Sequence, residues 1–145
     1  MNKLKYGASV FDFDETVGFS NNIVTATKGG YTISITSYDW PKVGEKMISD
    51  GWVMNFDDFN KITNGTPGPL IGKLKNQIKK YSNESVYILT ARHSDSEQAI
   101  YKWLLEQGIE LKRENIVGLG NSTGEAKAKW IQNNLIETGV NDIYF

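Results

Sequence analysis

Apolar residues fall along the chain in two patterns, short continuous runs and runs with helical spacing. The continuous runs predict buried strands at residues 8–13, 86–89, 115–118 and 142–145. Apolar residues three or four positions apart predict helices that begin near residues 67–69, 94 and 122. This alternation predicts an α/β fold, a Rossmann-like, doubly wound parallel sheet with helices on both faces.

Polar residues mark the ends of the last two helices. Ser94–Glu97 and Ser122–Glu125 have the spacing of capping boxes, in which a hydroxyl and a carboxylate satisfy the first backbone N–H groups. Gly108 is expected to end the first of these helices, and the second is expected to end near Gly139.

One segment interrupts the alternation of strands and helices. Residues 23–27 and 31–36 flank the turn Lys28–Gly30, and the second arm alternates apolar and hydroxyl side chains, so the segment predicts a β-hairpin. The stretch from Tyr38 to Thr66 is predicted to be irregular. We expect residues 18–66 to form a flap or small cap inserted into a single domain of residues 1–145.

Composition narrows the class of protein. The net charge of −1 gives no electrostatic support for nucleic-acid binding, and the absence of cysteine excludes disulfides and thiolate metal sites. The N-terminal residues lack the apolar core of a signal peptide, and no apolar run approaches membrane-spanning length. We therefore expect a soluble cytoplasmic protein whose oligomeric state the sequence leaves open.

The candidate chemistry begins at the end of the first predicted strand. Asp12 and Asp14 are two residues apart, so on an extended strand their side chains point the same way from its carboxyl end. Two adjacent carboxylates repel each other, and a hard cation such as Mg²⁺ removes that conflict. The pair therefore predicts a Mg²⁺ site that also receives a phosphoryl group.

Two more residues belong to the same edge of a parallel sheet. Thr90 ends the second core strand, and Lys127 falls in the first turn of the last helix, where free N–H groups favour anions. Together with the two aspartates, they would supply a nucleophile, a hydroxyl donor and a cation around one point.

This set of residues resembles the haloacid dehalogenase superfamily of aspartate-nucleophile phosphohydrolases. Residues 12–16 match its Asp-x-Asp-x-Thr motif, residues 89–92 its second motif, and Lys127 its third-motif lysine. The resemblance implies that Asp12 is the nucleophile, that Asp14 is the general acid and base, and that Mg²⁺ binds the Asp12 carboxylate and the Asp14 backbone carbonyl. It also implies that Thr90 and Lys127 bind phosphate, and that the substrate is a small phosphomonoester, with nucleotides among the options.

The family's fourth motif is the one that this chain does not match. That motif places one or two acids after a late apolar strand, and here residues 143–145 resemble the strand but end the sequence. Asp142 precedes that strand and would lie at the wrong end of the sheet. We therefore expect the carboxyl end of the domain to be missing and the activity of this chain to be impaired.

Other residues have alternative interpretations. Arg92 is a candidate substrate contact or a surface residue, His93 and the Asp57–Asp58 pair are expected at the surface, and Lys129 fits the third motif less well than Lys127. The aromatic residues of the insertion form either its small core, which we favour, or a stacking surface for a base or sugar; they are Tyr38, Trp40, Trp52, Phe56 and Phe59. Residues 118–120 are expected to form a turn.

Two other functional classes remain open. One is a non-catalytic relative that binds phosphate or a protein partner, which the unmatched fourth motif favours. The other is a response-regulator receiver, which also combines acids, a hydroxyl and a lysine, but places its acids on different strands. The position of Asp12 and Asp14 on one strand argues against a receiver.

Overall fold

A four-stranded parallel sheet forms the centre of the protein. The computed structural model describes residues 7–121, 123–138, 140 and 142–144. The strand order is β8-β7-β1-β9 and all neighbouring pairs are parallel; the bounds are β1 Gly7–Phe11, β7 Val86–Thr90, β8 Ile116–Gly118 and β9 Asp142–Tyr144. The chain moves outward from β1 through β7 to β8 and then returns to the other side of β1. The strand order therefore changes direction between β1 and β9.

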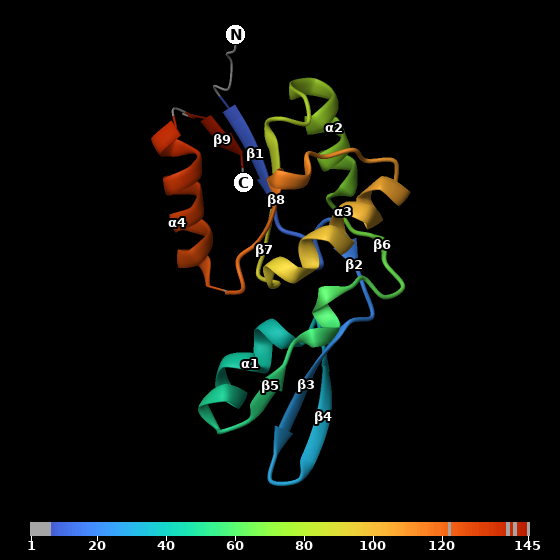
Figure 1. Cartoon of the computed structure of the whole chain (residues 1–145), viewed down its shortest axis with the longest axis vertical. Helices are drawn as coiled ribbons and strands as arrows, with labels where there is room; N and C mark the ends of the chain where they lie inside the picture. Colours follow the sequence, from blue (N-terminus) through green and yellow to red (C-terminus); the bar gives the residue numbers. More distant parts are fainter. Residues whose placement is uncertain (1–6, 122, 139, 141, 145) are drawn as a thin grey trace.

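Helices cover both faces of this sheet. Helices α2 (Ile71–Tyr81) and α3 (Glu97–Glu106) lie on one side, and α4 (Gly124–Asn134) lies on the other (Figure 1). Alternate residues of the strands face the two layers, as expected for buried parallel strands. Phe11, Val86 and Ile88 pack with the α2 and α3 side chains, whereas Val10, Tyr87 and Leu89 pack with those of α4. The predicted α/β fold is confirmed at this level.

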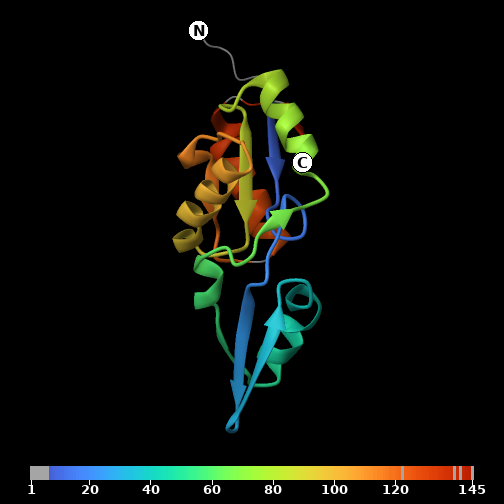
Figure 2. The ribbon, with the colours of Figure 1, turned by 90° about the vertical axis from the view of Figure 1, so that its right-hand side faces the viewer.

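The insertion after β1 forms a second lobe, which we call the cap (residues 18–67). Its stem is the antiparallel pair β2 (Gly18–Phe19) and β6 (Thr66–Pro67), and the lobe extends away from the sheet (Figures 1 and 2). Beyond the stem, an antiparallel sheet in the order β4-β3-β5 is joined by helix α1 and the 3₁₀ turn η1; the bounds are β3 Ile23–Lys28, β4 Tyr31–Thr36, α1 Trp40–Ser49, β5 Val53–Asn55 and η1 Asp57–Asn60.

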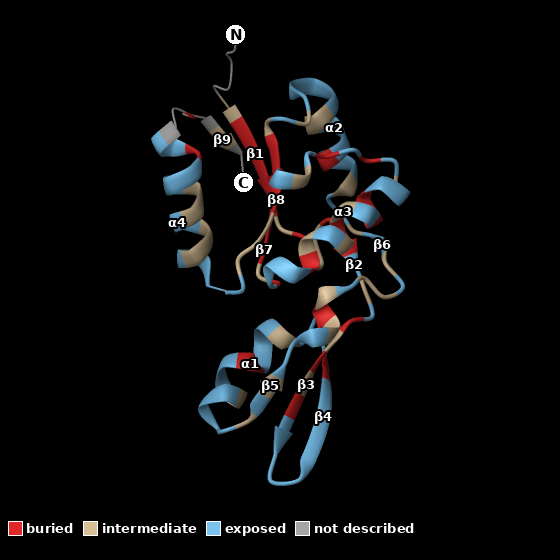
Figure 3. Cartoon of the chain, in the orientation of Figure 1, coloured by how far each residue is buried: buried red, intermediate tan, exposed pale blue. Residues whose placement is uncertain are grey.

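The cap has its own small apolar core. Val24, Ala26, Ile35 and Phe59 are buried there (Figure 3), and Trp40, Met47, Trp52 and Met54 pack against them. The predicted hairpin is confirmed, but the prediction of irregular structure from Tyr38 to Thr66 is wrong, because this stretch contains α1, β5 and η1. The helix α1 was obscured in the sequence by Pro41 in its first turn and by Gly44, a small residue on its buried side.

The predicted helix caps differ from the observed ones. Ser94 does not cap a helix: His93 Nδ1 accepts from the Asp95 N–H, and the Glu97 carboxylate instead accepts from Gly118 N–H at 2.8 Å. At α4 the capping residue is Thr123, whose Oγ1 accepts from Ala126 N–H at 3.1 Å.

The remaining boundaries lie close to their predicted positions. Strand β1 ends at Phe11 rather than residue 13, and α4 ends at Asn134. The predicted roles of Ser122, Gly139 and Phe145 lie outside the described residues. In the part of the chain that the structure describes, no helix is both long enough and apolar enough to cross a membrane.

Asp58 ties the first strand of the cap to its last turn, which gives a stability prediction. Its Oδ2 accepts from Ile23 N–H at 2.8 Å and from Asn22 Nδ2 at 3.2 Å, and Lys61 Nζ lies 3.5 Å from Oδ1. Burial alone would raise the pKa of Asp58, but these hydrogen bonds and the Lys61 charge lower it below the ordinary value of 3.8. The charged form is therefore preferred in the folded state.

We expect Asp58→Asn to lower the free energy of unfolding by roughly 1 kcal/mol at pH 7. Because the folded pKa is lowered, this contribution is present above about pH 3.8 and is lost as the pH falls through the folded pKa. The difference from the parent protein should thus shrink in acid. Urea unfolding followed by tryptophan fluorescence at several pH values measures it, with the exposed neighbour Asp57→Asn as control. Equal destabilisation by both variants would contradict the assignment.

Candidate functional site

A tight turn follows β1 at the edge of the sheet that faces the cap. The Phe13 carbonyl accepts backbone hydrogen bonds from residues 16–18 at 2.9–3.1 Å. The Phe13 ring is fully buried and meets Trp103 edge-to-face, with 5.7 Å between the ring centroids. This anchor fixes the turn, so the positions of Asp12 and Asp14 on either side of Phe13 are set by the core.

The two aspartates on this turn pair with different cations. They were predicted to extend side by side from a strand, but β1 ends at Phe11 and Asp12 already lies outside it. Asp12 forms an ion pair with Lys127, and Asp14 forms one with Arg92. Both acids line the same pocket, but each has its own cation.

Asp12 is the more exposed of the two acids. Its Oδ1 accepts from Phe13 N–H at 2.8 Å and lies 3.3 Å from Lys127 Nζ. The Asp12 side chain is 41% exposed, whereas that of Lys127 is 16% exposed. Thr123 begins α4 and thereby places Lys127 in the first turn of the helix, as predicted, while Lys129 is exposed to solvent.

The surroundings of Asp12 shift its protonation equilibrium. Burial raises the pKa of Asp12 above 3.8, and the nearby charge of Asp14 adds to this rise. Lys127 and the Phe13 N–H lower the pKa but do not cancel the effect of burial. A carboxylate that is partly desolvated in this way is a stronger base and interacts more strongly with an added cation.

Asp14 is held by a two-point ion pair with Arg92. Arg92 Nε donates to Asp14 Oδ2 at 2.9 Å, and Nη2 donates to Oδ1 at 2.7 Å. The guanidinium side chain is 1% exposed and the carboxylate 20%. This geometry is the strong, planar form of a carboxylate–arginine interaction.

The other N–H groups of Arg92 bind the two chain segments that connect the sheet domain to the cap. Nη1 donates to the carbonyls of Phe59 and Lys61 at 3.0 and 2.9 Å, and Nη2 also reaches Ser20 Oγ and Asn22 Oδ1 at 3.2 and 3.3 Å. Arg92 is therefore buried, which excludes the surface role among its two predicted alternatives and leaves the substrate contact as a prediction. It lines the pocket, but its five N–H groups all have protein acceptors.

Thr90 lies at the end of β7, next to this network. Its side chain is fully buried, and its Oγ1 accepts from the Arg92 backbone N–H at 3.1 Å. Its carbonyl accepts from Leu119 N–H, and the Arg92 carbonyl accepts from Gly120 N–H, so the chain after β8 stays bonded to the segment that ends β7. The turn predicted at residues 118–120 is reduced to a bend at Gly120, since Gly118 still belongs to β8. Thr90 does not line the pocket that contains the two aspartates. Phosphate binding by Thr90 stays a prediction.

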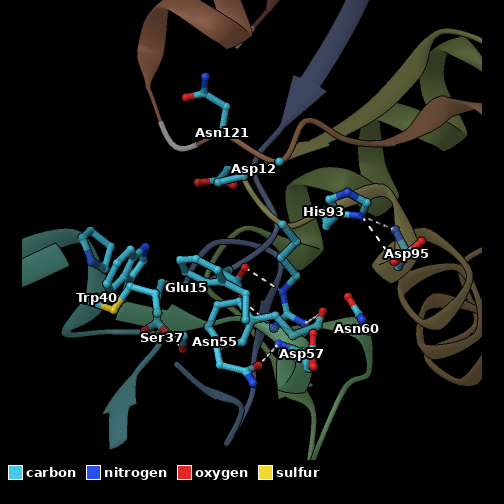
Figure 4. A pocket seen from close by; sticks show the side chains of 18 of the residues that line it. Asp12, Glu15, Ser37, Trp40, Asn55, Asp57, Asn60, His93, Asp95 and Asn121 are labelled. Atoms are coloured by element: carbon cyan, nitrogen blue, oxygen red, sulfur yellow. Dashed lines mark hydrogen bonds and ion pairs between the residues drawn. The ribbon is translucent and has the colours of Figure 1, made fainter. Parts of the chain in front are cut away.

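A pocket of about 1070 Å³ separates the sheet edge from the cap. Asp12 and Asn121 lie on its sheet side, while Trp40, Ser37 and Asn55 come from the cap on the opposite side (Figure 4). Such a volume is at the upper end of the range for small-molecule sites. The aspartates thus open onto a space that is much larger than a phosphate.

Glu15 and Ser37 join the sheet edge to the cap within this pocket, and neither was predicted as a site residue. Ser37 Oγ donates to Glu15 Oε2 at 2.9 Å. Glu15 has a φ of +64°, a left-handed conformation that is unusual for a residue with a side chain. Such strain is often found at functional sites.

The remaining candidate residues lie at the rim of the pocket or within the cap. His93 is 65% exposed and lies 3.5 Å from Asp95 at the rim, which agrees with the expected surface position. Asp58 was expected to be solvated like Asp57, but its hydrogen bonds to the cap give it a structural role.

The described residues include one carboxylate whose position would suit a Mg²⁺ ion. Among residues 7–121, 123–138, 140 and 142–144, no group of three or more His, Cys, Asp or Glu side chains could hold a metal ion. The Asp12 carboxylate faces the pocket and suits Mg²⁺, which binds one or two carboxylates together with water and phosphate. Asp14 gives both carboxylate oxygens to Arg92. Asp142 pairs with Gly7, at the far end of β1 from Asp12.

Comparison with known proteins adds no assignment. No family model, no curated protein and no solved structure matches this chain significantly. The argument for function therefore rests on the chemistry of the site.

The Asp14–Arg92 pair gives a second stability prediction. We expect Arg92→Met to lower the free energy of unfolding by roughly 3–5 kcal/mol, because it leaves a largely buried carboxylate without its cation. Arg92→Lys should recover little of this free energy of unfolding, since an ammonium group cannot make the two-point contact. Urea unfolding measures both. The control is Arg113→Met, which breaks a more exposed pair with Glu97 and should cost less than about 1 kcal/mol; an equal loss in the control would contradict this ranking.

The Asp12–Lys127 pair gives a prediction about titration. Carbonyl ¹³C NMR should show Asp12 titrating above pH 3.8. Lys127→Met should raise the pKa further, because it removes the charge that opposes the effect of burial. Lys129→Met, two residues along the same helix, should leave the titration unchanged. A lower Asp12 pKa in Lys127→Met would be inconsistent with the ion pair.

Proposed function

We propose that this protein is a Mg²⁺-dependent phosphohydrolase of the haloacid dehalogenase type, acting on a small phosphomonoester through Asp12. The observation that carries the proposal is the convergence of Asp12, Asp14 and Lys127 on one pocket at the carboxyl edge of the parallel sheet. Ligands of open α/β sheets bind at this edge, where the strand order changes direction, and here that point is beside β1. The order of β8, β7, β1 and β9 also supports a Rossmann-like sheet.

The proposed reaction has two steps. In the first, a bond forms between the Asp12 carboxylate oxygen and phosphorus while the bond to the leaving oxygen breaks, and that oxygen takes a proton from Asp14. In the second, water attacks phosphorus and gives a proton to Asp14, and the bond to Asp12 breaks to release inorganic phosphate. Lys127 offsets the negative charge on the transferring group, which is the main requirement of phosphoryl transfer.

The ion pair with Arg92 places a condition on Asp14. Both of its oxygens accept hydrogen bonds from Arg92, so a proton can reside on Asp14 only if one of these contacts opens. We propose that substrate binding under the cap opens this contact. Thr90 is fully buried outside the pocket lining, so its hydroxyl would hold a phosphoryl oxygen only once this opening exposes it.

Asp12 is the described residue best suited to hold Mg²⁺. When bound, the ion would neutralise charge on the phosphoryl oxygens and on Asp12. Burial raises the pKa of Asp12 more than Lys127 lowers it, so the charged carboxylate would be stabilised by a further cation. We propose that such an enzyme acts in the cytoplasm, which the cysteine-free composition favours.

One observation favours a second candidate function. The pairing of both acids with protein cations, together with a described metal site limited to Asp12, would also suit a domain that binds a phosphorylated ligand without hydrolysing it. The receiver alternative has less support, because Asp12 and Asp14 leave a single turn after one strand.

Hydrolysis assays on the Asp12→Asn variant distinguish these functions. With Mg²⁺ present, we expect this variant to lose at least about 10³-fold in kcat, because the nucleophile is gone. Circular dichroism should show that the fold persists. Inorganic phosphate released from a panel of phosphomonoesters, with Mg²⁺ or with a chelator, is the measurement. Undiminished hydrolysis by the variant would refute the role of Asp12, and binding of phosphate without turnover by the parent protein would favour the second candidate.

Lys127 provides an independent test with a matched control. Lys127→Ala should reduce kcat/KM by about 10²-fold, the usual cost of losing one charge-stabilising donor. Lys129→Ala removes the same charge from the exposed side of α4 and should leave kcat/KM within about twofold. Equal losses in the two variants would contradict the specific role of Lys127.

A further inference from the structure

The cap side of the pocket is more apolar than a phosphate alone requires. Trp40, Phe56, Ile48 and Met54 line it opposite the aspartates, together with Pro41. Phe56 is 42% exposed and Ile48 54% exposed. Apolar and aromatic side chains gathered along a pocket with few polar groups are typical of ligand sites, so this wall has the character of a binding surface for the part of a substrate that lies beyond its phosphate.

The Trp40 ring is held in place for such a role. It meets the Phe56 ring edge-to-face, with 5.2 Å between centroids. It also lies against Gly44 of α1, where an added Cβ would be only 2.7 Å from two atoms of the indole. Glycine in a helix interior costs about 1 kcal/mol relative to alanine. Gly44 is therefore explained by the position of the indole rather than by the helix.

The charges of the pocket limit what can accompany the phosphate. Five carboxylates and two cations line it among the described residues, and both cations already form ion pairs with Asp12 and Asp14. No further cation of the described lining is available for a second phosphate or another anionic group. Asn55, Asn60 and Asn121 supply neutral polar groups. The pocket therefore suits a leaving group that is uncharged, planar and partly polar.

We infer that the cap selects phosphomonoesters whose leaving group carries a neutral aromatic ring, and that this ring stacks on Trp40 and Phe56. The inference rests on the proposed function and names its substrate class. A nucleobase and a simple aryl ring share the required chemistry. The arginine and lysine of the site bind Asp14 and Asp12, so discrimination falls to the aromatic wall.

Two matched pairs of substrates test this inference with Mg²⁺ present. Adenosine 5′-monophosphate and ribose 5-phosphate differ by the base, and benzyl phosphate and glycerol phosphate compare leaving groups with and without an aromatic ring while both leave as alkoxides. We expect kcat/KM to favour the aromatic member at least about tenfold, the usual effect of one stacking contact. Preference in the first pair alone identifies a base; preference in both identifies any aromatic ring. Equal kcat/KM within both pairs would overturn the inference while leaving the proposed function intact.

Two variants connect that preference to the wall. Phe56→Leu should reduce the ratio of kcat/KM values about tenfold, and Gly44→Ala should do the same by displacing the indole without touching the ligand. Tyr31→Leu removes an aromatic ring from the exposed tip of the cap hairpin, 74% exposed, and should leave the ratio unchanged. An unchanged ratio in both Phe56→Leu and Gly44→Ala would overturn the inference.

A binding measurement separates the inference from the proposed function. Saturation-transfer NMR with adenosine, which has no phosphate, should show contact through the base in the parent protein and weaker contact in Phe56→Leu. If no phosphomonoester is hydrolysed but adenosine binds in this way, the proposed function fails and the aromatic site stands. If phosphomonoesters are hydrolysed and adenosine does not bind, the inference fails and the function stands.

Discussion

The position of the cap and the state of the site both depend on the buried guanidinium of Arg92. It joins the turn after β1, the end of β7 and both chain segments that enter the cap, through contacts of 2.7–3.3 Å. A buried arginine is tolerated only when every N–H group finds an acceptor. Because Asp14 supplies two of those acceptors, the residue proposed to move protons is also part of what fixes the cap. Any movement of the cap must therefore change the surroundings of Asp14.

The difference in exposure between the two acids agrees with the different roles proposed for them. Asp14 is mostly covered and gives both oxygens to the protein, whereas Asp12 is 41% exposed and faces the pocket. Lys127 compensates the negative charge of Asp12 only in part, because burial still raises the pKa of Asp12. Asp12 is thus the acid that can contact an incoming substrate. The hydrogen bonds of Asp14, by contrast, depend on the position of the cap through Arg92. This division follows from packing, since both residues leave the same fixed turn.

The sequence predicted the sheet because its strands are read from local patterns. Continuous apolar runs identify β1 and β7, and the capping-box pattern at residues 122–125 predicted the start of α4 closely enough to locate Lys127 in its first turn. The contacts of Arg92 could not be predicted in this way, because its partner Asp14 is 78 residues away in the chain. Helix α1 was missed for a different reason: its buried side includes Gly44, which no hydrophobic pattern records.

Phe59 shows why the cap core and the site cannot vary independently. Its ring belongs to the apolar core of the cap and also stacks on the Arg92 guanidinium, with 4.6 Å to the centroid, while its carbonyl accepts from Nη1 at 3.0 Å. The small core of this lobe holds Phe59 in place, and Phe59 in turn covers the charge that binds Asp14. A smaller side chain at this position would expose the guanidinium to water and weaken its interaction with the carboxylate. The apolar packing of the cap therefore contributes to the electrostatics of the pocket that it covers.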